Sequence, residues 1–73
     1  KLILVGESPL GTLYGKTGSD CRNGKWILGW FVGFVVHDGR PFVFAANIQA
    51  ADGASGPKAR EIVEKCLRKA KLY

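Results

Sequence analysis

The chain has 73 residues, of which 47% are hydrophobic, and a formal net charge of +5 at pH 7. The hydrophobic fraction is normal for a folded protein and excludes intrinsic disorder, while the length allows one domain at most, with a modest core. The longest apolar run, residues 26–36, is well short of the ~20 residues that a membrane-spanning helix needs.

Glycine, proline and Asx-Gly pairs divide the chain into short elements. Residues 1–5, which are apolar after Lys1, predict either a helix end or a short strand, and residues 6–11 predict a loop. The segment 20–25, which contains Asn23-Gly24, predicts a turn, and Asp38-Gly39 predicts a tight hairpin, because glycine accepts the positive φ that such a turn requires. Between these breaks, strands are expected over residues 12–19, 26–37 and 41–50.

A terminal helix is expected after the loop 51–56. Ser55 can cap it, and Pro57 suits its first turn. Apolar residues then recur every three or four positions and predict one apolar face: Ala59, Ile62, Val63, Cys66, Leu67 and Ala70. The predicted fold class is α+β, a three-stranded antiparallel meander plus a C-terminal helix. Because residues 26–37 are apolar at nearly every position and one helix covers only one face of a sheet, the sequence indicates that further segments complete the domain.

Much of the positive charge lies in residues 58–71. An anionic partner such as nucleic acid or a membrane surface would explain it, as would a solvated helix face with cations toward its C-terminus. The second explanation is favoured and a nucleic-acid partner is not expected, because aromatic residues are not interleaved with the basic ones. No residues have the spacing of a metal site. Cys21 and Cys66 could form a disulfide in an exported protein, but a buried free thiol at Cys66 is favoured.

The most informative segment is Lys16-Thr17-Gly18 on the first long strand. An ammonium group lowers the cost of nearby negative charge, a threonine hydroxyl can donate to a carboxylate, and a glycine lets a ligand lie against the strand. Alone, the triplet favours an ordinary strand end with a solvated lysine. It is followed by Gly29-Trp30-Phe31-Val32-Gly33-Phe34-Val35, then by Phe44-Ala45-Ala46-Asn47, and then by the helix.

This order resembles the penicillin-recognising serine enzymes, whose third active-site element is K-T-G. The resemblance covers residues 12–72 and is greatest to class D (oxacillinase-type) β-lactamases and to the extracellular sensor domains that detect β-lactams. It implies that residues 1–73 are the C-terminal part of one such domain, a fragment of its α-β-α sandwich. Gln49 departs from the aspartate often found there in class D enzymes, which weakens the placement in that subfamily.

The resemblance also implies roles for particular residues. Lys16 and Thr17 would face the carboxylate side of the substrate, and Lys16 would lie close to the nucleophile. Gly18, which has no side chain, would let the substrate lie against the strand edge. The backbone N–H of Ser19 would be one donor of the oxyanion hole. Arg60 stands where the family often has an arginine that binds the carboxylate, although it could instead be a surface residue paired with Glu64 four positions on. The catalytic serine would lie outside this chain. So would the family's carboxylated lysine, which is formed with carbon dioxide, and no cofactor is expected within this chain.

The function expected from the resemblance is hydrolysis of β-lactam antibiotics through an acyl-enzyme by a class D-like serine β-lactamase. The alternatives are the penicillin-binding sensor domain of a β-lactam-responsive signal transducer, or an isolated fragment with no activity. The partners implied are the β-lactam and the remaining N-terminal part of the domain as a second chain. The location implied is the periplasm or the outer face of a bacterial membrane.

Overall fold

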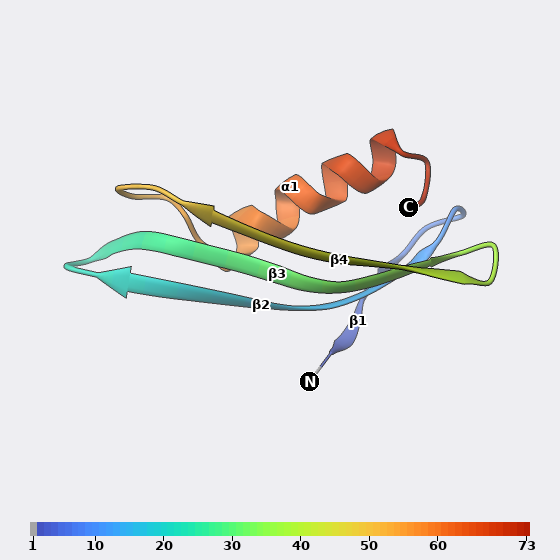
Figure 1. Ribbon diagram of the computed structural model, residues 1–73, viewed down its shortest axis with the longest axis horizontal. Helices are drawn as coiled ribbons and strands as arrows, with labels where there is room; N and C mark the ends of the chain where they lie inside the picture. The colour runs from blue at the N-terminus through green and yellow to red at the C-terminus, as the bar shows by residue number, and fades with distance from the viewer. Residues whose placement is uncertain (1) are drawn as a thin grey trace.

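A computed structural model describes residues 2–73, so that Lys1, the first residue of the expected 1–5 element, lies outside the described part. Four strands are followed by one helix: β1 (Ile3–Glu7), β2 (Thr12–Arg22), β3 (Lys25–His37), β4 (Arg40–Gln49) and α1 (Gly56–Lys69). Figure 1 shows the strands as one long, twisted sheet with α1 lying across a single face. The α+β class and the terminal helix are as predicted.

The sheet has four strands in the order β1-β2-β3-β4, all antiparallel, rather than the predicted three. The additional strand begins in the segment 1–5, for which a helix end and a short strand were both open, and continues through Gly6 and Glu7, for which the loop prediction was wrong. It pairs with β2 from Ile3 opposite Gly15 to Glu7 opposite Thr12. The loop between β1 and β2 closes with a hydrogen bond from the Ser8 N–H to the Gly11 carbonyl (2.9 Å). Pairing with β2 gives the backbone groups of β1 hydrogen-bond partners.

Turns are present at both predicted positions, the turn at Asn23-Gly24 and the hairpin at Asp38-Gly39. Asn23 and Gly24 have φ values of 52° and 73°, and Asp38 and Gly39 have 51° and 74°, as in the two-residue turns that match the twist of paired strands. Only two residues form each turn. The prediction of a turn over all of residues 20–25 was therefore wrong, because β2 continues to Arg22 and β3 begins at Lys25.

The core lies between α1 and the sheet face that it covers. Leu13, Phe31 and Val35 are fully buried there, and the sheet contacts a row of helix residues four positions apart, Ala59, Val63 and Leu67. Phe31 lies over Gly15, where an added Cβ would come within 2.4 Å of the ring. Because Gly15 has no side chain, the Phe31 ring, the largest fully buried side chain, can occupy the space beside β2.

The buried stripe of α1 is narrower than predicted. Ile62 is 40% exposed, and Cys66 is exposed as well as free. The prediction of a buried thiol at Cys66 was therefore wrong, because only one row of the helix meets the sheet and Cys66 lies on the neighbouring row. Cys21 is also free and exposed, so the two thiols form no disulfide in this structure.

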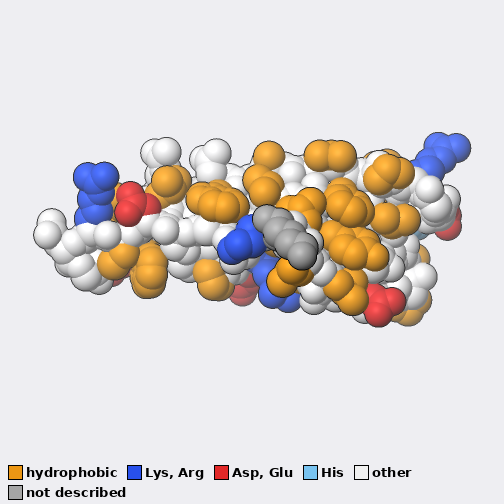
Figure 2. Space-filling view, turned by 90° about the horizontal axis from the view of Figure 1, so that it is seen from below, with side chains coloured by type: hydrophobic (Ala, Val, Ile, Leu, Met, Phe, Trp, Pro, Cys, Tyr) orange, Lys and Arg blue, Asp and Glu red, His pale blue; other side chains and the backbone are white. Residues whose placement is uncertain are grey.

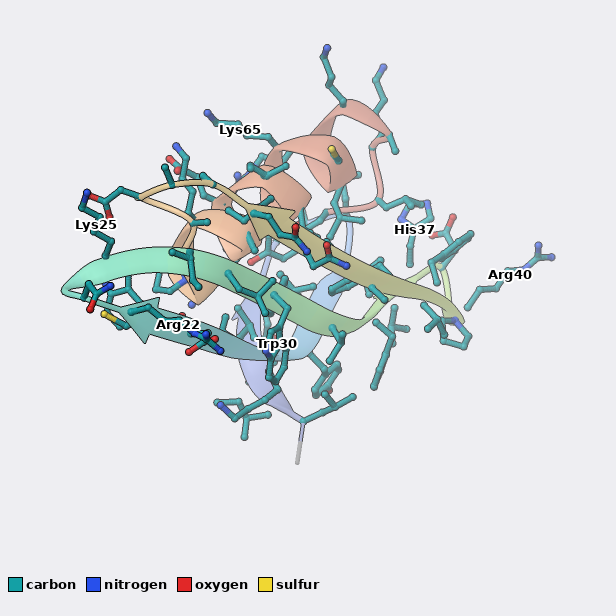
Figure 3. The ribbon with its side chains drawn as sticks, turned by 60° about the vertical axis from the view of Figure 1, so that its left-hand side comes forward. Arg22, Lys25, Trp30, His37, Arg40 and Lys65 are labelled. Atoms are coloured by element: carbon teal, nitrogen blue, oxygen red, sulfur yellow. The ribbon has the colours of Figure 1, made fainter. Side chains whose placement is uncertain are left out.

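No helix among residues 2–73 lies on the other face of the sheet. The aromatic side chains of β2 and β3 cover part of this face, with the rings of Tyr14 and Phe34 stacked at a centroid distance of 4.9 Å, and Trp30 points away from α1 (Figure 3). Val43 of β4 remains 83% exposed. Figure 2 views the molecule from this side and shows hydrophobic side chains spread along the sheet. The single helix covers one face, as expected, whereas the apolar composition of the strands predicts cover on both faces.

Candidate functional site

The K-T-G triplet lies where β2 becomes an edge strand. Pairing between β1 and β2 stops at Gly15, whereas pairing between β2 and β3 continues to Arg22. Within residues 2–73, the outer side of β2 beyond Gly15 therefore has no neighbouring strand. We call the outer side of residues 16–19 the K-T-G edge.

The register shows which backbone groups this edge presents. The Ile27 carbonyl accepts a hydrogen bond from the first residue after β4 (3.2 Å), so Ile27 directs its backbone groups toward β4. Alternate residues of a strand direct these groups to opposite neighbours, so Trp30 directs its own toward β2, where its partner is Gly18. Thr17 and Ser19, on either side of Gly18, consequently direct their N–H and C=O groups to the K-T-G edge.

Lys16 and Thr17 line a hollow at this edge. Lys16 is exposed and its Nζ donates to the Thr17 carbonyl at 2.7 Å. The hollow has a volume of about 230 Å³, and Arg60 of α1 reaches it as well. Its walls are Ile3, Val5, Gly15, Lys16, Thr17, Phe31 and Arg60. The structure thus brings an ammonium, a hydroxyl and a guanidinium from two distant segments to one place.

Arg60 also lines a groove of about 470 Å³ along α1, and Thr17, like Arg60, lines both this groove and the hollow. The groove is lined by Thr17, Pro57, Arg60, Glu61, Glu64, Lys65 and Arg68. Arg60 donates through Nε to Glu64 at 2.6 Å, and Arg68 donates to the other oxygen of the same carboxylate at 3.0 Å. The surface ion pair that the sequence left open for Arg60 is therefore formed, and the same arginine still lies beside the K-T-G edge.

Glu61 belongs to a separate ion pair in this groove. Lys58 donates to its carboxylate at 3.1 Å, and this hydrogen bond, with the charges of Lys58 and Lys65, holds the pKa of Glu61 below its ordinary value. Lys65 points away from the sheet in Figure 3.

The start of α1 is fixed to the K-T-G edge. The Gly56 N–H donates to the Ser19 hydroxyl at 2.6 Å, and an added Cβ at Gly56 would lie 2.8 Å from the Gly18 carbonyl oxygen. Ser55 caps the helix as predicted, its hydroxyl accepting from the Lys58 N–H at 3.3 Å. We call the hydrogen bond between the Gly56 N–H and the Ser19 hydroxyl the tether. Sequence reasoning missed it, because it assigned Ser19 only a backbone role.

On its other face, the K-T-G edge is packed against an aromatic ring. A Cβ added at Gly18 would come within 2.0 Å of Trp30. Gly18 is therefore required by the indole beneath it, in addition to any ligand that lies along the edge. His37 lies at the far end of the sheet, with Nδ1 2.6 Å from the Leu10 carbonyl and Nε2 3.3 Å from Asp38, and takes no part in this site.

We expect Ser19→Ala to lower the free energy of unfolding by ~1–3 kcal/mol, the usual cost of leaving a buried polar group without its partner. Gly56 is buried, and the substitution removes the acceptor of its N–H. Urea unfolding of the wild type, Ser19→Ala and Ser19→Thr measures this, since threonine keeps the hydroxyl and is expected to retain most of the stability. Equal losses in both variants would contradict the tether.

Two negative findings apply to residues 2–73. They contain no group of three or more His, Cys, Asp or Glu side chains that could hold a metal ion. No helix among them is both long enough and apolar enough to cross a membrane.

Several known proteins are similar to this chain in sequence. Residues 4–68 match the family described as penicillin binding protein transpeptidase domain. The regulatory protein BlaR1 of Bacillus licheniformis is 39% identical over 97% of this chain, and the methicillin resistance mecR1 protein of Staphylococcus aureus is 40% identical over 80% of it. The probable beta-lactamase YbxI of Bacillus subtilis is 38% identical over 94%.

The chain spans 12%, 10% and 24% of the lengths of these three relatives, respectively. The family match covers most of the chain and includes the K-T-G edge and nearly all of α1. The chain therefore belongs to the penicillin-binding protein transpeptidase domain family.

Proposed function

We propose that this chain forms the K-T-G side of the β-lactam-binding site in the sensor domain of a signal transducer similar to BlaR1 and mecR1. The observation that carries the proposal is the K-T-G edge itself. It is an unpaired strand edge at Thr17 and Ser19, with Lys16 and Arg60 beside it. A regulatory role is favoured over hydrolysis because relatives named as regulatory and resistance proteins match at 39–40% identity.

In this proposal a serine outside the chain attacks the lactam carbonyl and loses its hydroxyl proton, the C–N bond of the ring opens, the ring nitrogen takes up a proton, and an acyl-enzyme forms. The Ser19 N–H donates to the oxygen on which negative charge develops. The Lys16 ammonium stabilises that charge, and the Thr17 hydroxyl and Arg60 guanidinium hold the carboxylate of the β-lactam. Gly18 allows the ligand to lie against the strand.

The second candidate is a class D-like serine β-lactamase. The similarity to the probable beta-lactamase YbxI supports it. The difference between the two functions lies in the step after acylation, since a hydrolase needs a base that activates water. In the class D resemblance that base is the lysine carboxylated by carbon dioxide, which would belong to the part of the domain outside this chain.

In either case, the remaining part of the domain is proposed to supply the nucleophile and to cover the open face of the sheet. The domain is proposed to lie outside the cytoplasm, at the outer face of a bacterial membrane, where β-lactams are met.

Incubating the full-length protein with a fluorescent penicillin tests the proposal. A covalent adduct that persists for many minutes is expected for the sensor, whereas an adduct that forms and decays rapidly with release of hydrolysed penicillin would support the hydrolase. The 73-residue chain alone is the control and should gain no label, because the nucleophile is absent. A full-length protein that never gains the mass of penicillin would contradict both candidates.

A further inference from the structure

Glu64 lines the same groove as Thr17, and its carboxylate is hydrogen-bonded to two arginines. Its side chain is only 15% exposed, and each of its carboxylate oxygens accepts from a different arginine. Oε2 accepts from Nε of Arg60 at 2.6 Å, and Oε1 accepts from Nη2 of Arg68 at 3.0 Å. The three residues are four positions apart, so they lie in one row on the helix surface.

The way in which Arg60 is held leaves its ligand-binding groups free. A guanidinium has five N–H donors in a rigid planar fork, and its two terminal amino groups match a carboxylate. Within residues 2–73, the Arg60 guanidinium donates only through Nε. The bond to Glu64 therefore fixes the plane of the fork and leaves both terminal amino groups available to a ligand beside Thr17.

The charges of the row have the matching sign. Arg60 and Arg68 carry two positive charges against the single negative charge of Glu64, so the row keeps one positive charge. Arg68 also donates to the second oxygen of Glu64. Because both oxygens of Glu64 already accept a hydrogen bond, the carboxylate competes less with a ligand for the terminal amino groups of Arg60.

We propose that Glu64 is a positioning residue, which orients the Arg60 guanidinium so that its terminal amino groups face the carboxylate of the β-lactam beside Thr17. The inference rests on the proposed function for the identity of the ligand, but the orientation of Arg60 can be tested without any ligand.

Nitrogen-15 NMR of the full-length protein tests the orientation. The Nε–H signal of Arg60, identified by its loss in Arg60→Lys, is expected to exchange slowly with water in the wild type and faster in Glu64→Gln. Glu7→Gln is the matched control, because it removes the same charge from an exposed residue of β1, and it should leave the signal unchanged. Because a glutamine oxygen can still accept from Nε–H, Glu64→Ala, which has no acceptor, is measured beside it, and slow exchange that survives in Glu64→Ala would overturn the proposal.

Acylation kinetics then test the effect on the ligand. Glu64→Gln should slow acylation by a penicillin with a free carboxylate about tenfold, through weaker initial binding, because a charge-assisted hydrogen bond that orients Arg60 is lost. It should have no effect on a penicillin whose carboxylate is esterified, whereas a general loss of folding would slow both. In an Arg60→Ala background the Glu64 substitution should add nothing.

Faster acylation in Glu64→Gln would show that Glu64 competes with the ligand for Arg60, and equal losses with the free and the esterified penicillin would show a structural role only. Either result would overturn the proposal. If the wild type is not acylated at all, the proposed function fails, and the NMR comparison still decides whether Glu64 orients Arg60.

Discussion

Lys16→Ala is expected to slow acylation of the full-length protein by penicillin about 10²- to 10³-fold, the range seen when one preorganised electrostatic group is removed from an active site. The Lys16 ammonium lies at the K-T-G edge, where its Nζ donates to the Thr17 carbonyl at 2.7 Å. The substitution removes the positive charge that would stabilise the developing oxyanion. The measurement is the rate at which the fluorescent adduct appears at several penicillin concentrations.

Lys25→Ala is the matched control, because Lys25 is also an exposed lysine of the same sheet and lies at the turn between β2 and β3 (Figure 3). It should acylate at the wild-type rate. Because Lys16 is exposed, its replacement should leave the melting temperature unchanged, and this separates a chemical effect from a folding effect. Acylation of Lys16→Ala at the rate of Lys25→Ala would contradict the role of Lys16 in the proposed site.

The strands and hairpins were predictable because their signals are local. Asn23-Gly24 and Asp38-Gly39 specify tight turns through the backbone freedom of glycine alone, and the structure has both turns with positive φ. The cap at Ser55 likewise depends only on its own neighbours in the chain. By contrast, residues 3–7 carry no signal that separates a strand from a helix end, and it is the pairing with β2 that makes them a strand.

Features that depend on contacts across the fold could not be predicted from the sequence. The helix stripe predicted Cys66 to be buried, yet only one row of α1 meets the sheet, so that Cys66 is exposed. The approach of Arg60 to Thr17, and the bond between Gly56 and Ser19, join segments about forty positions apart. No spacing rule connects such positions. For Arg60 the residue pattern itself carried only the i,i+4 pair with Glu64, and only the family resemblance assigned Arg60 to the same site as Lys16 and Thr17.

Phe31→Ala is expected to lower the free energy of unfolding by ~3–5 kcal/mol, the usual cost of removing a buried aromatic ring from a core. The ring is fully buried. It lies over Gly15 and has its centroid 5.1 Å from that of Phe44. Gly15 has no side chain that could fill the cavity left by the ring. Urea unfolding of the domain that contains this chain, followed by tryptophan fluorescence, measures the loss.

Phe34→Ala is the informative comparison, because Phe34 belongs to the same strand and faces the other side of the sheet, where it stacks on Tyr14 and is only half-buried. In the 73-residue chain this variant should lose clearly less stability than Phe31→Ala, since part of the ring already contacts water. In the full-length protein the two losses should become similar, if the remaining part of the domain covers the open face. A loss at Phe34 that stays small in the full-length protein would contradict that cover, whereas a small loss at Phe31 would contradict the core described here.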